Sequence, residues 1–185
     1  MKRIFATLAV ISTSILLATF VLGWTIGDAT SRDPDVQQMV AWHFLTAVGG
    51  LMFAALVHAI VLTYFMGTGR WLEETSQAYK LSKSRLSESR SLKYRTLPWM
   101  AVALLLLIVA GGFGAVADPA SPAGAAGFGG IPAATIHFLV ASIAIVANAI
   151  INFVEYNAID RNSQLVQEVL DDVHRIRTEK GLPVE

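Results

Sequence analysis

Four long apolar segments are the feature of this sequence that most restricts its fold. They occupy residues 4–23, 39–66, 97–116 and 131–154, and each is long enough for a helix to cross about 30 Å of hydrocarbon. A soluble chain would interrupt such segments with polar residues every few positions, because amphipathic packing requires it. The sequence therefore predicts an all-α integral membrane protein whose four transmembrane helices form a bundle.

The distribution of charge predicts how the chain crosses the membrane. Lys2 and Arg3 precede the first apolar segment, and the connection between the second and third segments is rich in bases. These bases are Arg70, Lys80, Lys83, Arg85, Arg90, Lys93 and Arg95. The two other connections carry mostly acids, among them Asp28, Asp33 and Asp118. By the positive-inside rule we expect a multi-pass protein of the inner (plasma) membrane with both termini in the cytoplasm.

The same pattern divides the chain into four parts. Residues 1–69 form a first transmembrane hairpin, and residues 70–96 form a cytoplasmic basic helix or linker. Residues 97–158 form a second hairpin, and residues 159–185 form a cytoplasmic amphipathic helix. The sequence thus predicts two helical hairpins with cytoplasmic helical extensions after the second and fourth helices.

Local signals suggest where these helices begin and end. Gly67 and Gly69 are expected to end or bend the second helix, and Pro98 is expected in the first turn of the third. The low-complexity connection 117–132 is expected to be irregular.

The two cytoplasmic segments need partners of different kinds. Apolar residues at helical spacing run from Ile159 to Ile176, and this stripe should pair with the other cytoplasmic helix or with a second copy of the chain. The basic segment 70–95 could instead lie on anionic lipid. We expect the chain to belong to a larger membrane complex or a homo-oligomer assembled through these helices.

A repeated motif connects the two hairpins. "AWHFLTAVGG" begins at residue 41 and "TIHFLVASIA" at residue 135, so superposing His43 on His137 aligns His-Phe-Leu at the start of two apolar segments. The preceding "LGWTIGD" and "GGFGAVAD" both end on Asp, at Asp28 and Asp118. We interpret the hairpins as parallel repeats that place both histidines at one depth near the outer face.

Two histidines at one depth predict a shared ligand. One interpretation is a b-type haem held by His43 and His137 in an electron-transfer subunit, with quinone as a possible redox partner. In overall plan the chain resembles four-helix membrane cytochromes that place histidine pairs on two helices. Small residues would give room for a macrocycle or permit close helix packing. They are Gly49, Gly50, Gly111, Gly112 and Gly114.

His58 is a further candidate for cofactor binding. It lies 15 residues after His43, which is about 22 Å along a helix. Its equivalent in the repeat is Asn152, a poor haem ligand, so the sequence suggests one haem at most. Asn148, Asn152 and Glu155 share one face of the fourth helix and could join His58 in a proton relay, a quinone site or interhelical hydrogen bonds.

Two alternatives to haem stay open. His43 and His137 could join Asp28 or Asp118 to bind zinc, copper or iron. Both histidines could also be structural, in a non-catalytic assembly or scaffold protein. The sequence has no cysteine, which excludes disulfides, thiolate metal sites and covalent haem attachment. It carries no nucleotide loop, hydrolase motif or nucleic-acid signature, so any enzymatic role is that of a redox subunit.

Overall fold

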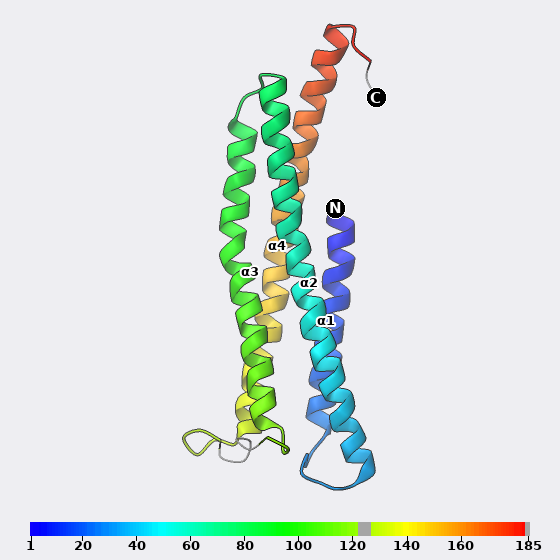
Figure 1. Cartoon of the computed structure of the whole chain (residues 1–185), viewed down its shortest axis with the longest axis vertical. Helices are drawn as coiled ribbons and strands as arrows, with labels where there is room; N and C mark the ends of the chain where they lie inside the picture. The colour runs from blue at the N-terminus through cyan, green and yellow to red at the C-terminus, as the bar shows by residue number, and fades with distance from the viewer. Residues whose placement is uncertain (122–126, 184–185) are drawn as a thin grey trace.

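The computed structural model describes residues 1–121 and 127–183, and it consists of long helices that run alternately up and down (Figure 1). They are α1 (Lys2–Thr25), α2 (Pro34–Ala78), α3 (Ser84–Ala117) and α4 (Ala133–Glu179). All four are long and apolar enough to cross a membrane. Parts of two predicted segments, residues 122–126 of the irregular connection and 184–185 of the C-terminal helix, lie outside the described residues.

The helices form a ring in which α1 packs on α2 and α4, and α3 packs on the same two helices. Within the described residues α2 and α4 also touch across the bundle, whereas α1 and α3 do not. Because α1 is shorter than the other three helices, α2, α3 and α4 extend beyond its N-terminal end (Figure 1). We call this part of the bundle, formed by residues 70–96 and 159–183, the projecting end.

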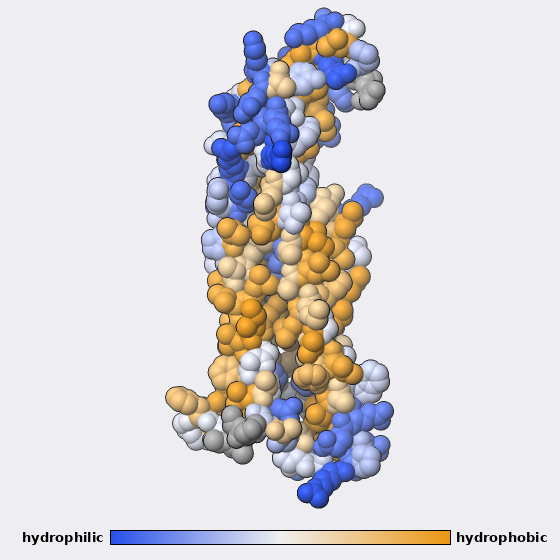
Figure 2. Space-filling model, viewed as in Figure 1, coloured by the Kyte–Doolittle hydropathy of each residue, from blue (hydrophilic) through white to orange (hydrophobic). Residues whose placement is uncertain are grey.

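The surface of the bundle suits a lipid environment. Large apolar side chains point outward, including Met52 at 70%, Ile108 at 68% and Phe153 at 67% exposure. Figure 2 shows an apolar band across the middle of the viewed face, with hydrophilic residues gathered at both ends. Exposed apolar area of this extent would aggregate in water, so the band marks the surface that a membrane covers.

The helix ends follow local sequence signals in some places and not in others. Asp33 caps α2, since its carboxylate accepts the N–H of Asp35, and Pro34 takes the first helical position. The expectation that α3 starts at Pro98 is wrong, because α3 begins at Ser84 and Pro98 lies inside it. A proline removes one backbone hydrogen bond from a helix. Here the buried side chains of Leu86 and Met100, on either side of Pro98, keep α3 packed.

The apolar stripe at the end of α4 is covered within the chain. Leu72 of α2 and Leu86 of α3 pack against Val169 and Val173 of α4, and all four side chains are buried. The first of the two expected partners, the other polar helical segment of the same chain, therefore covers the stripe. No second copy is needed to bury it.

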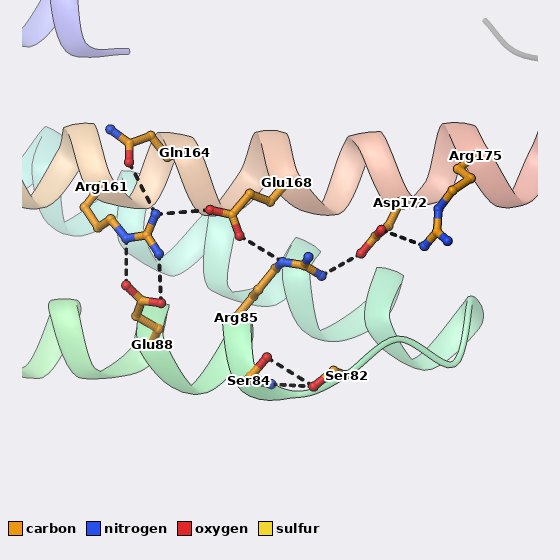
Figure 3. A network of polar contacts seen from close by, with 9 residues as sticks. All are labelled: Ser82, Ser84, Arg85, Glu88, Arg161, Gln164, Glu168, Asp172 and Arg175. Carbon is orange, nitrogen blue, oxygen red and sulfur yellow. Dashed lines mark hydrogen bonds and ion pairs between the residues drawn. The ribbon is translucent and has the colours of Figure 1, made fainter.

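Charged residues hold α3 against α4 at the projecting end (Figure 3). Arg161 of α4 binds both carboxylate oxygens of Glu88, at 2.7 and 3.0 Å. Arg85 of α3 donates to Glu168 at 3.0 Å and to Asp172 at 2.6 Å. Because Arg161 also reaches Glu168 at 3.1 Å, these pairs form one connected network.

This network predicts that acid weakens the projecting end. Hydrogen bonds from Arg85 and then Arg161 lower the pKa of Glu168, and hydrogen bonds from Arg175 and then Arg85 lower the pKa of Asp172. A carboxyl with a lowered pKa contributes stability above its ordinary pKa and loses it as the pH falls through the folded-state value. The hydrogen-exchange protection factors of residues 159–183, which are corrected for the intrinsic pH dependence of exchange, should therefore fall below the ordinary range of carboxyl pKa values and stay constant above it. The same dependence in Arg85→Gln protein would contradict this cause.

Candidate functional site

A cavity of about 570 Å³ lies between the helices at the end of the bundle remote from the termini. Residues at the end of α1, the start of α2, the end of α3 and the start of α4 line it. The lining is mainly small and apolar, and includes Gly23, Ala47, Gly111, Gly114, Ala115 and Ala141. The small side chains on α1, α2, α3 and α4 leave part of the space between the helices unfilled.

His43 and His137 meet at this cavity. They come from α2 and α4, the two helices that face each other across the bundle, and both line the cavity. Their ring centres are 6.2 Å apart and their planes make an angle of 74°. Two residues separated by 94 positions in the sequence thus bring their rings close together at one cavity.

A backbone carbonyl orients each imidazole. Nδ1 of His43 lies 3.0 Å from the carbonyl oxygen of Thr19 on α1, and Nδ1 of His137 lies 3.1 Å from that of Ala110 on α3. A carbonyl only accepts, so Nδ1 carries the proton in both rings. The neutral imidazole then has its lone pair on Nε2. No hydrogen-bond partner of either Nε2 is found among the described residues.

A glycine lies beside each ring. A methyl group added to Gly23 would lie 2.7 Å from Cε1 of His43, and one added to Gly114 would lie 3.0 Å from Cε1 of His137. Each glycine follows the carbonyl that binds the same ring by four residues, one helical turn. The two halves of the site are therefore built alike: one histidine, one carbonyl and one glycine from the preceding helix.

Gly23 was not predicted to be part of the site, whereas Gly114 was. The signal was available, because Gly23 opens the "GWTIGD" whose likeness to the end of the third helix identified Asp28 and Asp118. What was missing was the rotation of the helix, which decides whether a glycine faces a ring or the lipid.

Other residues that the sequence suggested lie apart from the two rings. Gly50 packs against Ile15 and Leu16 of α1, and Gly49 has nothing within 4 Å of an added Cβ. Neither lines the cavity, so Gly50 serves close helix packing.

The suggested carboxylate ligands bind backbone and hydroxyl groups near the helix ends. Asp28 accepts from the N–H and the hydroxyl of Thr30, which lowers the pKa of its carboxyl, and Asp118 accepts from the N–H of Ala120. Across residues 1–121 and 127–183, no three or more His, Asp or Glu side chains group as metal ligands would. His43, His137, Asp28 and Asp118 therefore do not assemble into one ligand set.

His58 lies in a separate polar cluster deeper in the bundle. Its Nδ1 is 2.7 Å from a carboxylate oxygen of Glu155, and its Nε2 is 3.1 Å from the amide oxygen of Asn148. His58 and Glu155 are 1% and 0% exposed. The other oxygen of Glu155 and both polar atoms of Asn152 are buried without a partner in the described structure.

An apolar layer separates this cluster from the cavity. Leu16, Ala54, Leu107 and Ala144 pack together and are buried, and Asn148 follows Ala144 by one turn of α4. His58 does not line the cavity. The structure thus assigns the histidines to two distinct polar environments.

Comparisons of the chain with protein-family models, with curated proteins and with solved structures found no match.

Proposed function

We propose that the chain binds one b-type haem between His43 and His137 and acts as an electron-transfer subunit in a membrane. The separation of 6.2 Å between the two ring centres carries this proposal. A metal–imidazole bond of about 2 Å, added to an imidazole radius of about 1 Å on each side, puts two axial ligand rings about 6 Å apart. The rings already have the spacing that one shared metal ion requires.

The hydrogen bonds of the rings support the same ligand. Imidazole ligands of metals usually donate their other N–H to a carbonyl or carboxylate, which fixes the tautomer and the ring orientation. Thr19 and Ala110 provide such carbonyls for His43 and His137. In a neutral imidazole that donates Nδ1–H to a carbonyl, the lone pair lies on Nε2, the atom that would bind iron.

The number of protein ligands favours haem over a bare metal ion. Structural zinc is held by four ligands and catalytic zinc by three protein ligands, whereas the part of the chain that the structure describes offers two histidines with no third metal-binding side chain grouped with them. Iron in a haem takes its remaining ligands from the macrocycle, so two histidines complete the set. A haem bound here would supply one-electron transfer.

The cavity has the size and composition of a cofactor site. Its volume of about 570 Å³ falls in the range of roughly 300–1,000 Å³ that is usual for ligand pockets. Gly111 and Gly114 of α3 and Ala141 of α4 leave room for a ligand on their side of the cavity. In Figure 2 the apolar band is hollowed at this end of the bundle.

The proposal includes a topology. The basic residues of the projecting end and the N-terminus would face the cytoplasm of a cell with an inner membrane, and the cavity would lie near the outer face. Phe44 and Val48 line the cavity and are also exposed on the apolar surface. A lipid-soluble carrier such as a quinone could therefore exchange electrons at this edge, with a further subunit or a second copy as the other partner.

Spectroscopy of the purified protein tests the proposal. We expect a Soret band, α and β bands in the dithionite-reduced minus oxidised difference spectrum, and one non-covalent haem per chain by the pyridine haemochrome assay. Protein produced with excess haem that still shows a featureless Soret region would contradict the proposal and favour the non-catalytic assembly role.

The glycines beside the rings provide a sharper prediction. Gly23→Ala adds a methyl group 2.7 Å from the ring of His43, which must move and lose its alignment. We expect haem affinity to fall by about ten- to a hundredfold, as for other changes that disturb the orientation of a metal ligand. Gly114→Ala should have a smaller effect, since the corresponding distance is 3.0 Å.

Gly112→Ala is the matched control for this prediction. It makes the same substitution on α3, but nothing lies within 4 Å of the added Cβ. Haem content measured by absorbance should match that of the unaltered protein. Equal losses in Gly23→Ala and Gly112→Ala would show that helix packing in general, and not the ring contact, sets the affinity.

A further inference from the structure

A second, smaller pocket of about 150 Å³ lies between α2 and α3, apart from the cavity lined by His43 and His137. Phe65, Met66, Gly69, Arg70 and Glu73 of α2 line one side of it. Ser89, Arg90 and Lys93 of α3 line the other. Arginine, lysine and apolar side chains thus share one small concave surface.

Hydrogen bonds fix the depth of this pocket in the bundle. Asn162 of α4 binds both Ser89 of α3 and Thr68 of α2, which sets these three residues at one level. Two residues before Asn162, Asp160 forms an ion pair with Lys2 at 3.0 Å, at the start of α1. The pocket therefore lies where α1 begins, at the boundary between the apolar band and the hydrophilic end (Figure 2).

The charges around the pocket are mainly positive. It is lined by three cations, Arg70, Arg90 and Lys93, and one acid, Glu73. Arg90 pairs with Glu73 at 3.0 Å across the pocket. Lys93 is half-buried and lies over the ring of Tyr94, and no carboxylate pairs with it among the described residues. An anion in the pocket would find an uncompensated ammonium group.

Gly69 keeps the pocket open. Nothing lies within 4 Å of a Cβ built at this position, so the floor of the pocket is bare backbone on this side. Met66, one turn toward the apolar band, is 60% exposed. The pocket therefore has cations on the side of the hydrophilic end and an apolar surface on the side of the apolar band, with a concave space between them.

We propose that this pocket binds the headgroup of an anionic phospholipid. Arg70, Arg90 and Lys93 would surround the phosphate, while the acyl chains lie along the apolar surface beside Met66. Basic pockets between transmembrane helices at the cytoplasmic boundary bind such headgroups because each cation near the surface contributes attraction to anionic lipid. The pocket lies at the boundary between the apolar band and the hydrophilic end, which is where the phosphate groups of a bilayer would lie. This inference is independent of any haem.

Two substitutions test the site without disturbing an ion pair. Gly69→Leu fills the pocket with a side chain and leaves every charge in place, and Lys93→Gln removes the cation that has no carboxylate partner. We expect Lys93→Gln to retain about fivefold less phosphatidylglycerol than the unaltered protein, the loss that corresponds to one cation near an anionic surface. Gly69→Leu should also retain less, because its side chain occupies the space of the headgroup. The measurement is native mass spectrometry of bound lipid after release from phosphatidylcholine nanodiscs with and without phosphatidylglycerol.

Matched controls separate the pocket from general charge and folding effects. Gly67→Leu makes the same exchange two residues away, where an added Cβ also meets open space and the residue does not line the pocket. Lys83→Gln removes one positive charge at the tip of the projecting end. Both controls should retain phosphatidylglycerol as the unaltered protein does.

Three results would overturn the proposal. The first is equal retention in all four variants, and the second is an equal loss in all four. The third is displacement of the lipid by inorganic phosphate at comparable concentration, because a site for soluble phosphate does not need the apolar surface beside Met66.

Discussion

Replacing either His43 or His137 with alanine should reduce haem affinity by more than about a hundredfold, beyond the usual effect of altering a residue that only orients a ligand. The two rings lie close together at one cavity, and no third metal-binding side chain is grouped with them in the described structure. With one imidazole gone, iron loses an axial ligand that nothing nearby can replace. The measurement is haem per chain after purification, with folding checked by circular dichroism.

His174→Ala is the control for this prediction. His174 lies exposed on α4 at the projecting end, so its loss changes the number of histidines without touching the cavity. Haem occupancy should be unchanged. Full occupancy in His137→Ala with loss only in His43→Ala would show that the iron has a different second ligand, and the paired geometry would then have no role in binding.

Removing His58 should destabilise the membrane-embedded bundle by about 3–5 kcal/mol, the usual cost of leaving one member of a buried ion pair without its partner. Glu155 is fully buried, its second oxygen already lacks a partner, and His58 supplies the contact to the first. An ordinary interhelical hydrogen bond in a membrane contributes about 0.6 kcal/mol. The size of the loss therefore distinguishes a buried charge pair from a simple hydrogen bond.

A double substitution separates the charge from the packing. His58→Leu alone should be strongly destabilising, whereas His58→Leu combined with Glu155→Leu should recover most of the stability, since apolar residues can replace a buried pair at little cost. The free energy of unfolding can be measured in bicelles by steric trapping. A double variant no more stable than His58→Leu would show that the cluster contributes through the shape of its side chains and not through pairing.

The length and apolar composition of the segments predicted the helices well, because a membrane requires every span to be long and apolar. Segments 4–23 and 97–116 were recognisable from length and composition alone. The alignment of His43 with His137 also came from sequence, because two like hairpins in one membrane place equivalent residues at equal depth. Depth along a helix is set by counting residues.

The rotation of each helix about its axis, and the side chains that pair between helices, could not be predicted in the same way. Gly23 and Gly49 are both glycines in apolar helices, yet one contacts an imidazole and the other meets open space. His58 pairs with Glu155, 97 positions later in the chain. The continuation of α3 through Pro98 depends on packing at the projecting end, which outweighs one lost backbone hydrogen bond. Each of these features is decided by a neighbouring helix.

The central claim is that two imidazoles from α2 and α4 hold one iron between them. Low-temperature electron paramagnetic resonance of the oxidised, haem-loaded protein tests it most directly, since the signal depends on both axial ligands and on the angle between their planes. The observed angle of 74° predicts a highly anisotropic low-spin ferric signal, the kind given by two nearly perpendicular imidazoles. A high-spin signal, which indicates at most one strong axial ligand, would contradict the claim.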